Sequence, residues 1–223
     1  MGRLTGKVAL ITGTGVGMGR ADALRFAAEG ATVVGCGLNP QTSEETVRFV
    51  HGAGGEMTSA APVDLSSFEA TQRWVAEAAA THGGIDELYN NASLPAVGPW
   101  DDLTVDQIAC WYRERAGPGL LFMQSRLAAH GAAKGGVLSF TYHLAAAGGP
   151  HRIRVNAILP GLIRTPSTEF LFASPDTPGR LLAAANPLGR VGEADDVAKL
   201  ASDDEWYINA AAIPVDGDQS VIE

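Results

Sequence analysis

Apolar and polar positions follow one another along this chain in blocks that predict strands and helices in turn. An apolar run beginning at Val8 is short enough for a buried strand, and a helix-like segment, Arg20–Glu29, follows it after a glycine-rich turn. Further strands are expected at residues 31–36, 57–63, 85–89, 153–158 and 211–215, and further helices at 42–52, 66–81, 105–115, 120–129 and 132–147. Alternating strands and helices indicate an α/β fold, a doubly wound parallel sheet with helices on both faces.

The alternation breaks once, between the helical segments 120–129 and 132–147. Only a few residues separate them, and no strand candidate lies between them. A doubly wound sheet normally passes through a strand at this point, so either the protein lacks one central strand or a segment is missing from the sequence. A missing strand would leave a gap beside the strand at 85–89, which another element or another chain has to close. An intact mass above 23.2 kDa would contradict this prediction.

Composition narrows the class of protein. A chain of 223 residues with 46% hydrophobic residues, and without repeats or linkers, fits a single domain over residues 1–223. The net charge of −9 argues against nucleic acid as a partner. Cys36 and Cys110 have no metal-ligand spacing, so we expect free thiols in a reducing cytoplasm and no metal site. The sequence shows no signal peptide and no apolar run long enough to span a membrane, which predicts a cytoplasmic protein without a membrane partner.

The turn after the first strand carries four glycines at alternate positions: Gly13, Gly15, Gly17 and Gly19. The spacing G-x-G-x-x-G is absent, and the looser T-G-x-x-x-G-x-G fits instead, beginning at Thr12. A strand, a tight glycine turn and a helix N-terminus together build an anion site, because the helix start offers unpaired N–H groups and glycines let a pyrophosphate approach. This order favours nucleotide binding over a bare turn.

Five motifs occur in one order along nearly the whole chain. They are the glycine turn, Val63-Asp64-Leu65, Asn90-Asn91-Ala92, Lys134-Gly135-Gly136 and Pro160–Thr165. Together they resemble the short-chain dehydrogenase/reductase family. The resemblance implies a Rossmann fold, NAD or NADP as cofactor, oxidation or reduction of a small alcohol or ketone, and a homo-oligomer, a dimer or a tetramer.

The resemblance also assigns cofactor contacts to particular positions. In order along the chain they are Gly13, Gly15, Gly17, Met18 and Gly19 at the pyrophosphate, Leu38 at the adenosine end, Asp64 and Leu65 at the adenine, Asn90, Asn91 and Ala92 at the adenine ribose, Lys134 at the nicotinamide ribose, and Ile163 and Thr165 at the carboxamide. Simpler alternatives stay open for some of them. Asp64 could cap the helix that follows it, and the two asparagines could be turn residues.

The catalytic positions depart from the family's pattern. The family places a tyrosine four residues before the lysine, and here that residue is His130. The partner serine has no counterpart, and the family's helix asparagine corresponds to Ala116. A lysine one helical turn away favours neutral imidazole, which suits a base for alcohol oxidation. Alternatively, His130 makes only a local hydrogen bond at a helix start.

The second strand ends without the acidic residue that NAD-binding folds place there for the adenosine ribose. The position reads Gly37, followed by Leu38 and Asn39, and no basic residue nearby offers a site for the 2′-phosphate of NADP. The lack of basic residues favours NAD slightly. The leading hypothesis is an NAD(P)-dependent oxidoreductase with an apolar substrate loop at residues 166–187. The alternatives are a nucleotide-binding regulatory protein and a dehydratase, isomerase or cyclase on the same scaffold.

Overall fold

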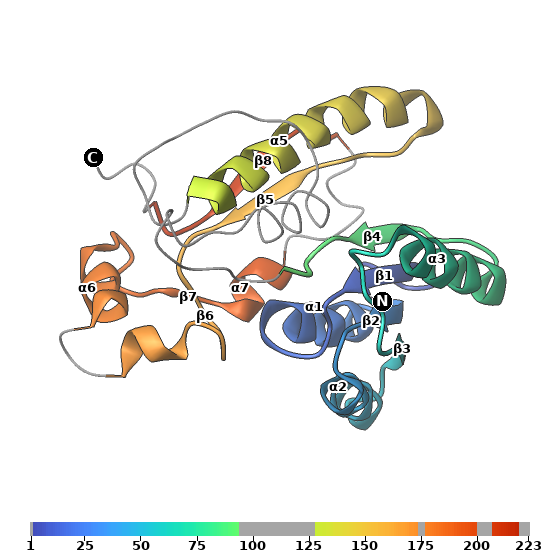
Figure 1. Ribbon diagram of the computed structural model, residues 1–223, viewed down its shortest axis with the longest axis horizontal. Helices are drawn as coiled ribbons and strands as arrows, with labels where there is room; N and C mark the ends of the chain where they lie inside the picture. The colour runs from blue at the N-terminus through green and yellow to red at the C-terminus, as the bar shows by residue number, and fades with distance from the viewer. Residues whose placement is uncertain (1, 94–127, 174–176, 200–206, 219–223) are drawn as a thin grey trace. The chain divides into compact units, whose positions relative to one another are not determined.

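The computed structural model describes residues 2–93, 128–173, 177–199 and 207–218 (Figure 1). The chain divides into two compact units. One contains residues 1–92, 159–204 and 214–223, and the other contains residues 93–158 and 205–213. The prediction of one domain over residues 1–223 stays a prediction.

The first unit contains a four-stranded sheet in the order β3-β2-β1-β4. The strands are β1 (Val8–Thr12), β2 (Thr32–Cys36), β3 (Glu56–Ala60) and β4 (Glu87–Tyr89). All three pairings are parallel, with Leu10 of β1 opposite Val34 of β2 and Leu88 of β4. The strands run into α1 (Gly17–Ala28), α2 (Pro40–Gly52) and α3 (Phe68–His82), as the pattern of apolar blocks predicts.

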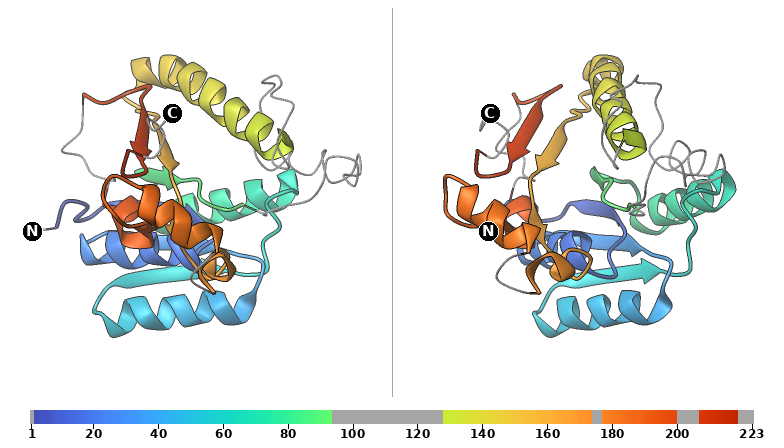
Figure 2. Two further views of the ribbon diagram at one scale, coloured as in Figure 1. Left: turned by 90° about the vertical axis from the view of Figure 1, so that its left-hand side faces the viewer. Right: turned by 60° about the vertical axis from the view of Figure 1, so that its left-hand side comes forward.

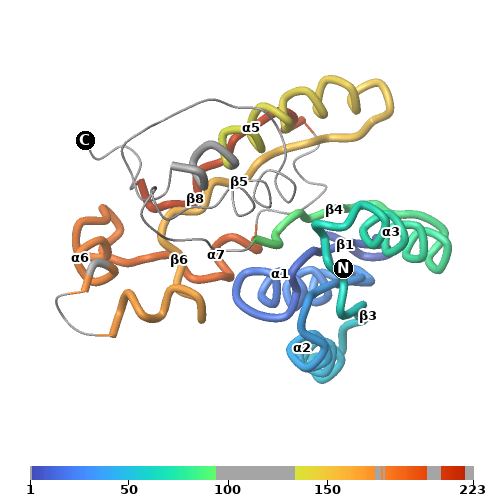
Figure 3. The backbone as a smooth tube through the Cα atoms, viewed as in Figure 1, coloured from blue at the N-terminus to red at the C-terminus, as the bar shows by residue number. Residues whose placement is uncertain are grey.

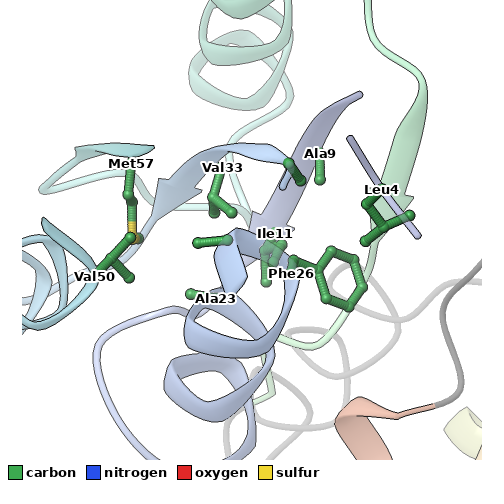
Figure 4. Close-up of a cluster of buried hydrophobic side chains, with 10 residues drawn as sticks. Leu4, Ala9, Ile11, Ala23, Phe26, Val33, Val50 and Met57 are labelled. Atoms are coloured by element: carbon green, nitrogen blue, oxygen red, sulfur yellow. The ribbon is translucent and has the colours of Figure 1, made fainter. Parts of the chain in front are cut away.

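Side chains alternate between the two faces of this sheet. Ala9 and Ile11 of β1 join a cluster with Phe26 of α1 and Val50 of α2 (Figure 4). Leu10 joins a second cluster, which includes Trp74 of α3. Neighbouring strand residues therefore bury against different helices, which is the doubly wound arrangement that the sequence predicts. Helix α2 runs alongside β3 in both views of Figure 2.

The C-terminal part of the first unit consists of short elements, whose path is followed in Figure 3. They are β6 (Ile163–Arg164), the 3-10 turn η3 (Glu169–Phe172), α6 (Pro178–Ala185), β7 (Gly192–Glu193) and α7 (Ala194–Ala198). β6 and β7 pair in parallel, and α7 packs on α1. The predicted substrate loop at 166–187 therefore contains a 3-10 turn and a helix.

The second unit contains the 21-residue helix α5 (Ala128–Gly148) and the 3-10 turn η2 (Gly149–His151). The strands β5 (Ala157–Pro160) and β8 (Ala212–Val215) form a two-stranded sheet with residues in both units. The strand expected at 153–158 is wrong over residues 153–156, because β5 begins only at Ala157. The Val155 N–H donates to the side chain of Asn209 at 2.9 Å, and the Asn156 amide bonds to Ile208 O and to the Ala211 N–H. These side-chain bonds, together with one backbone bond from the Ala210 N–H to the Val155 carbonyl oxygen at 3.0 Å, hold this segment.

Two further expectations concern the region between β4 and α5, part of which lies outside the described residues. No strand lies between β4 and α5 in the part of the chain that the structure describes, and residues 94–127, which contain the helix expected at 105–115, lie outside it. The helix expected at 132–147 corresponds to α5, which begins earlier, at Ala128. None of the helices within the described ranges is long and apolar enough to cross a membrane.

Candidate cofactor site

The glycine turn follows β1 directly and leads into α1. Its backbone is held at one end by Cys36 of β2, whose carbonyl oxygen accepts from the N–H groups of Gly13 and Thr14 at 2.9 and 3.1 Å. Gly13 and Gly17 have φ values of 73° and 61°. Residues with a side chain rarely adopt this left-handed conformation, so both positions require glycine. Helix α1 begins at Gly17, inside the turn, rather than at Arg20 as the sequence pattern suggests.

The N-terminus of α1 differs from that of its neighbour α2. The residue before α1 is Val16, whose side chain cannot cap the helix, and the first turn contains no acidic residue. At α2, Asn39 Oδ1 accepts from the N–H groups of Gln41 and Thr42 at 2.9 and 3.2 Å, and Pro40 has no N–H to satisfy. Of these two helix starts, only that of α1 lacks a side-chain cap and can offer its N–H groups to a bound anion.

Close packing explains two more glycines of the turn. A Cβ at Gly19 would collide with the carbonyl oxygen of Gly13 and with Nδ2 of Asn91, 2.5 Å away. A Cβ at Gly15 would lie 2.5 Å from Oγ1 of Thr42. The glycine turn thus packs against Asn91, which follows β4, and against Thr42 of α2. Met18, between Gly17 and Gly19, is half-buried.

The asparagine motif after β4 is joined to the end of β1. The N–H groups of Asn91 and Ala92 donate to Thr12 Oγ1 at 3.0 and 2.9 Å, and Asn91 Nδ2 donates to the carbonyl oxygen of Thr12 at 3.0 Å. Asn90 is exposed at the surface. Asn91 therefore holds the base of the glycine turn, beside the ribose contact that the family resemblance assigns to this motif.

The loop after β6 approaches the glycine turn within the same unit. A Cβ built on Gly17 would lie 3.5 Å from Cβ of Thr165, so the two residues are close neighbours. Thr168 fixes Thr165, because its Oγ1 accepts from the Thr165 N–H at 2.9 Å and donates to Ile163 O at 2.7 Å. Ile163 is buried, with 5% of its surface exposed. The structure thus brings together the pyrophosphate and carboxamide positions that the sequence assigns.

The predicted adenine contacts lie in the loop before α3. Asp64 Oδ1 accepts from the N–H and the hydroxyl of Ser66 at 2.9 and 2.7 Å, and these two hydrogen bonds hold the pKa of the Asp64 carboxyl below its usual value. Ser67, not Asp64, caps α3 through a bond from the Ala70 N–H. Leu65 packs on the cluster around Trp74. Asp64 is exposed, and both of these bonds use Oδ1, so the adenine contact that the resemblance assigns to Asp64 stays a prediction.

The segment after β2, where the resemblance places the adenosine end of the cofactor, begins with Gly37 and Leu38. Leu38 is 55% exposed, and a Cβ at Gly37 would lie 2.8 Å from the hydroxyl oxygen of Ser43. An acidic side chain at Gly37 would therefore displace Ser43. No arginine or lysine occurs between Cys36 and Val47, whereas Glu44 and Glu45 do.

Lys134 and His130 belong to the other unit. Both are part of α5, one helical turn apart, and Lys134 is exposed. The side chain of His130 lies outside the described residues, as do Ala116 and Cys110. The local spacing of these two residues on one helix is as the sequence predicts.

Two residues of α1 were missed by the sequence analysis. Arg20 donates to the turn carbonyl of Gly15, and Asp22 is fully buried although neither of its carboxylate oxygens has a hydrogen-bond partner among the described residues. Burial raises the pKa of Asp22 to about 8. Asp22 stands between Ala21 and Ala23 in an otherwise apolar stretch, which is the only signal in the sequence.

Known proteins resemble this chain in sequence and in fold. The sequence pattern of the family described as short chain dehydrogenase matches residues 7–113, and that of the family described as enoyl-(acyl carrier protein) reductase matches residues 120–218. The chain is 32% identical to 3beta-hydroxysteroid dehydrogenase 1 of Eggerthella lenta, with 96% of this chain and 94% of that protein covered. The chain belongs to the short-chain dehydrogenase family. It therefore belongs to a family of oxidoreductases that use a nicotinamide cofactor.

Two other short-chain dehydrogenases extend the comparison. The chain is 30% identical to the 3-oxoacyl-[acyl-carrier-protein] reductase FabG of Thermotoga maritima over 96% of this chain and 98% of that one. A short-chain dehydrogenase of Burkholderia cenocepacia, solved in complex with NADP, has a TM-score of 0.85 at 27% identity, covering 98% of this chain and 99% of that one.

The length of these alignments bears on the break in the pattern of strands. The alignment with the Eggerthella lenta enzyme runs over 252 positions, whereas this chain has 223 residues. The relative therefore contains residues that have no counterpart here. This agrees with the expectation that the chain lacks a segment that other short-chain dehydrogenases contain.

Proposed function

We propose that this protein binds NAD(H) across the N-terminus of α1 and oxidises a small, hydrophobic secondary alcohol to the ketone, or catalyses the reverse reduction. The observation that carries the proposal is the approach of Thr165 to Gly17 beside an α1 start without a side-chain cap. A dinucleotide bound there would place its pyrophosphate on the N–H groups of Gly17, Met18 and Gly19. Its carboxamide would reach Ile163 and Thr165.

The cofactor preference follows from charge at the adenosine end. A 2′-phosphate needs a cation or unpaired N–H groups, and the first N–H groups of α2 are already bonded to Asn39. Arg20, the cation that contacts the turn, is paired with Glu45 at 2.6 Å. The charged residues of the segment 36–47 are Glu44 and Glu45, so the extra phosphate of NADP would find no cation of this segment to pair with. These contacts favour NAD over NADP, although the Burkholderia cenocepacia relative was solved with NADP.

The proposed chemistry requires a group that accepts the hydroxyl proton of the alcohol. A nicotinamide cofactor held by Gly17, Ile163 and Thr165 would supply the acceptor for the hydride that the carbinol carbon gives up. His130 would take the proton from the substrate hydroxyl, leaving a carbonyl and an imidazolium. The positive charge of Lys134, one helical turn away, favours neutral imidazole before the reaction and would bind the nicotinamide ribose. In the reverse direction the same imidazolium returns the proton.

The substrate class rests on the loop at 166–187 and on the names of the relatives. Phe170, Leu181 and Leu182 are 68%, 62% and 40% exposed, so this loop presents apolar side chains to the surface. The names of the two curated relatives, a hydroxysteroid dehydrogenase and an oxoacyl reductase, both refer to interconversion of hydroxyl and keto groups. We propose an apolar substrate of this kind, a homo-oligomeric enzyme and a cytoplasmic location.

A titration of the purified protein with NADH and NADPH, followed by cofactor fluorescence, tests the proposal. We expect saturable binding of both cofactors, with NADH bound more tightly. Absence of binding at millimolar concentrations of either would refute the dehydrogenase function. Equal or tighter binding of NADPH would refute only the preference for NAD.

A second function is favoured by one specific observation. By the family resemblance, His130 stands at the position of the catalytic tyrosine, Ala116 stands at that of the asparagine, and the serine has no counterpart. The alternative is therefore a protein that binds the dinucleotide without hydride transfer, as a regulatory subunit or as a dehydratase, isomerase or cyclase. Tight NADH binding, without cofactor oxidation or reduction on any member of a panel of secondary alcohols and ketones, would favour this second function.

A further inference from the structure

The side chain of Arg20 connects the glycine turn to helix α2. Its Nη2 donates to the carbonyl oxygen of Gly15 at 2.5 Å and to Glu45 Oε2 at 2.6 Å. Its Nε donates to Oγ1 of Thr46 at 3.0 Å. The guanidinium carbon also lies 5.2 Å from the ring centre of Phe49. One side chain of α1 is thus fixed by the turn before it and by three residues of α2.

Thr46 of α2 also bonds directly to the glycine turn. The residue is fully buried, and its Oγ1 lies 2.9 Å from the carbonyl oxygen of Thr14 and 3.4 Å from that of Gly15. A hydroxyl has one hydrogen to donate, and Thr42 O of the same helix also lies within reach, at 3.1 Å. The nearest acceptor is the Thr14 carbonyl group, while the Gly15 carbonyl group has its donor in Arg20 of α1. None of these bonds is needed to begin α2, because α2 has its own cap in Asn39.

We propose that Arg20 and Thr46 form a clamp that sets the glycine turn in the shape that binds the cofactor pyrophosphate, so that Arg20 is a positioning residue for the dinucleotide. An anion is held by N–H groups that point inward, and this requires that the carbonyl groups of the same turn point outward. Donors placed outside the turn hold the carbonyl groups of Thr14 and Gly15 in that direction. Without them a carbonyl dipole can rotate toward the phosphates, which it repels.

The clamp deepens the proposed function and rests on it for the identity of the ligand. Arg20 reaches the turn from outside, and its charge is paired with that of Glu45. Its effect therefore passes through the conformation of the turn and not through a direct ion pair with the pyrophosphate. A bidentate fork is needed to reach both Gly15 O and Thr46 Oγ1, and lysine cannot supply one.

The test compares Arg20→Met with Arg25→Met in the full-length protein. Arg25 lies in the same helix and pairs with Glu29 at 2.7 Å, with a similarly half-buried side chain, but no bond from it to the turn is present in the described residues. Two quantities are measured for each variant: the Kd for NADH by fluorescence, and the rise in Tm caused by inorganic pyrophosphate. We expect a Kd about tenfold higher for Arg20→Met, a smaller pyrophosphate shift, and wild-type values for Arg25→Met.

Each outcome has one meaning. An unchanged Kd and an unchanged pyrophosphate shift in Arg20→Met would overturn the clamp, and so would an equal loss in Arg25→Met. If the wild type does not bind NADH, the proposed function fails; a pyrophosphate shift that Arg20→Met abolishes would still support the clamp.

Thr46→Val and Thr46→Ser provide the second pair of variants if Arg20→Met does not fold. Valine keeps the shape of threonine without its hydroxyl, whereas serine keeps the hydroxyl. Weaker NADH binding in Thr46→Val that Thr46→Ser restores supports the clamp. Equal binding in both variants contradicts it.

Discussion

Thr12 at the end of β1 accepts two hydrogen bonds from Asn91, which follows β4. The Asn91 N–H donates to Thr12 Oγ1 at 3.0 Å, and the Asn91 side-chain amide donates to the Thr12 carbonyl oxygen at 3.0 Å. Thr12 is 5% exposed, so water cannot readily replace these bonds. The two strand ends that flank the candidate cofactor site are thus fixed to each other by side-chain chemistry that goes beyond the strand ladder.

Replacement of Thr12 by valine should weaken both folding and cofactor binding. Valine has the same shape but no oxygen, so the N–H groups of Asn91 and Ala92 lose their acceptor, at a cost of about 1–3 kcal/mol in the free energy of unfolding. Urea unfolding measures this loss, and Thr12→Ser, which keeps the acceptor, serves as the control. A valine variant as stable as the serine variant would show that these bonds contribute nothing.

Gly19→Ala should abolish the tight packing of the glycine turn. The added methyl group would collide with the Gly13 carbonyl oxygen and with Nδ2 of Asn91. We expect NADH binding to be lost and the Tm to fall, because the turn must open to admit the methyl group. Gly52→Ala is the matched control, since a Cβ at Gly52 meets nothing within 4 Å. Retention of wild-type NADH affinity by Gly19→Ala would contradict the assignment of the pyrophosphate to this turn.

The buried carboxyl of Asp22 makes stability depend on pH. Burial raises its pKa to about 8 in the folded protein, whereas an unfolded aspartate titrates near ~3.9. Between these two values the folded state keeps a proton that the unfolded state has released. Stability is therefore lost as pH rises from about 4 to about 8, by roughly 1.4 kcal/mol for each pH unit attributable to this group.

Asp22→Asn should remove this dependence. The amide has the size of the carboxyl but no charge, so the variant should gain stability over the wild type at pH 8 and show little difference near pH 4.5. Thermal unfolding at several pH values measures both curves, and Glu77→Gln, at an exposed carboxyl of α3, controls for net charge. Parallel curves for Asp22→Asn and the wild type would mean that Asp22 does not titrate in this range. The charge of Asp22 also acts on Tyr89. Burial, and after it the negative charge of Asp22, raises the pKa of the Tyr89 phenol.

Features that depend on neighbours in sequence could be predicted from the sequence. The glycine turn, the parallel strands and the Ser-capped helix α3 follow from local patterns, and the structure contains them. The family resemblance, drawn from motifs such as Asn90-Asn91-Ala92, is confirmed by the relatives. Thr165 and Gly17 each follow a strand and are neighbours in the structure, while the cofactor roles that the resemblance assigns to them stay predictions.

Features that depend on distant packing could not be predicted. A polar residue on a helix normally indicates an exposed face, yet Asp22 is buried in the unit in which α7, far along the chain, packs on α1. The strand expected at 153–158 contains β-branched residues, but β5 begins only at Ala157. Before it, the Val155 N–H bonds to the side chain of Asn209, and the Asn156 side chain bonds to the carbonyl oxygen of Ile208. The role of Arg20 depends on where α2 begins, which Asn39 and Pro40 set two residues earlier than expected.

Replacement of His130 tests whether a histidine performs the family's proton transfer. We expect His130→Ala to lower kcat about 10²–10⁴-fold, the usual contribution of a positioned acid or base, with the Kd for NADH unchanged. The assay follows NADH formation with secondary alcohols, beginning with a 3β-hydroxysteroid, because one relative carries that name. His130→Tyr restores the family's residue beside Lys134, whose charge lowers the pKa of a phenol, and should recover part of the lost rate. If alanine leaves kcat unchanged, His130 makes only a local helix contact and the proton must leave by another route.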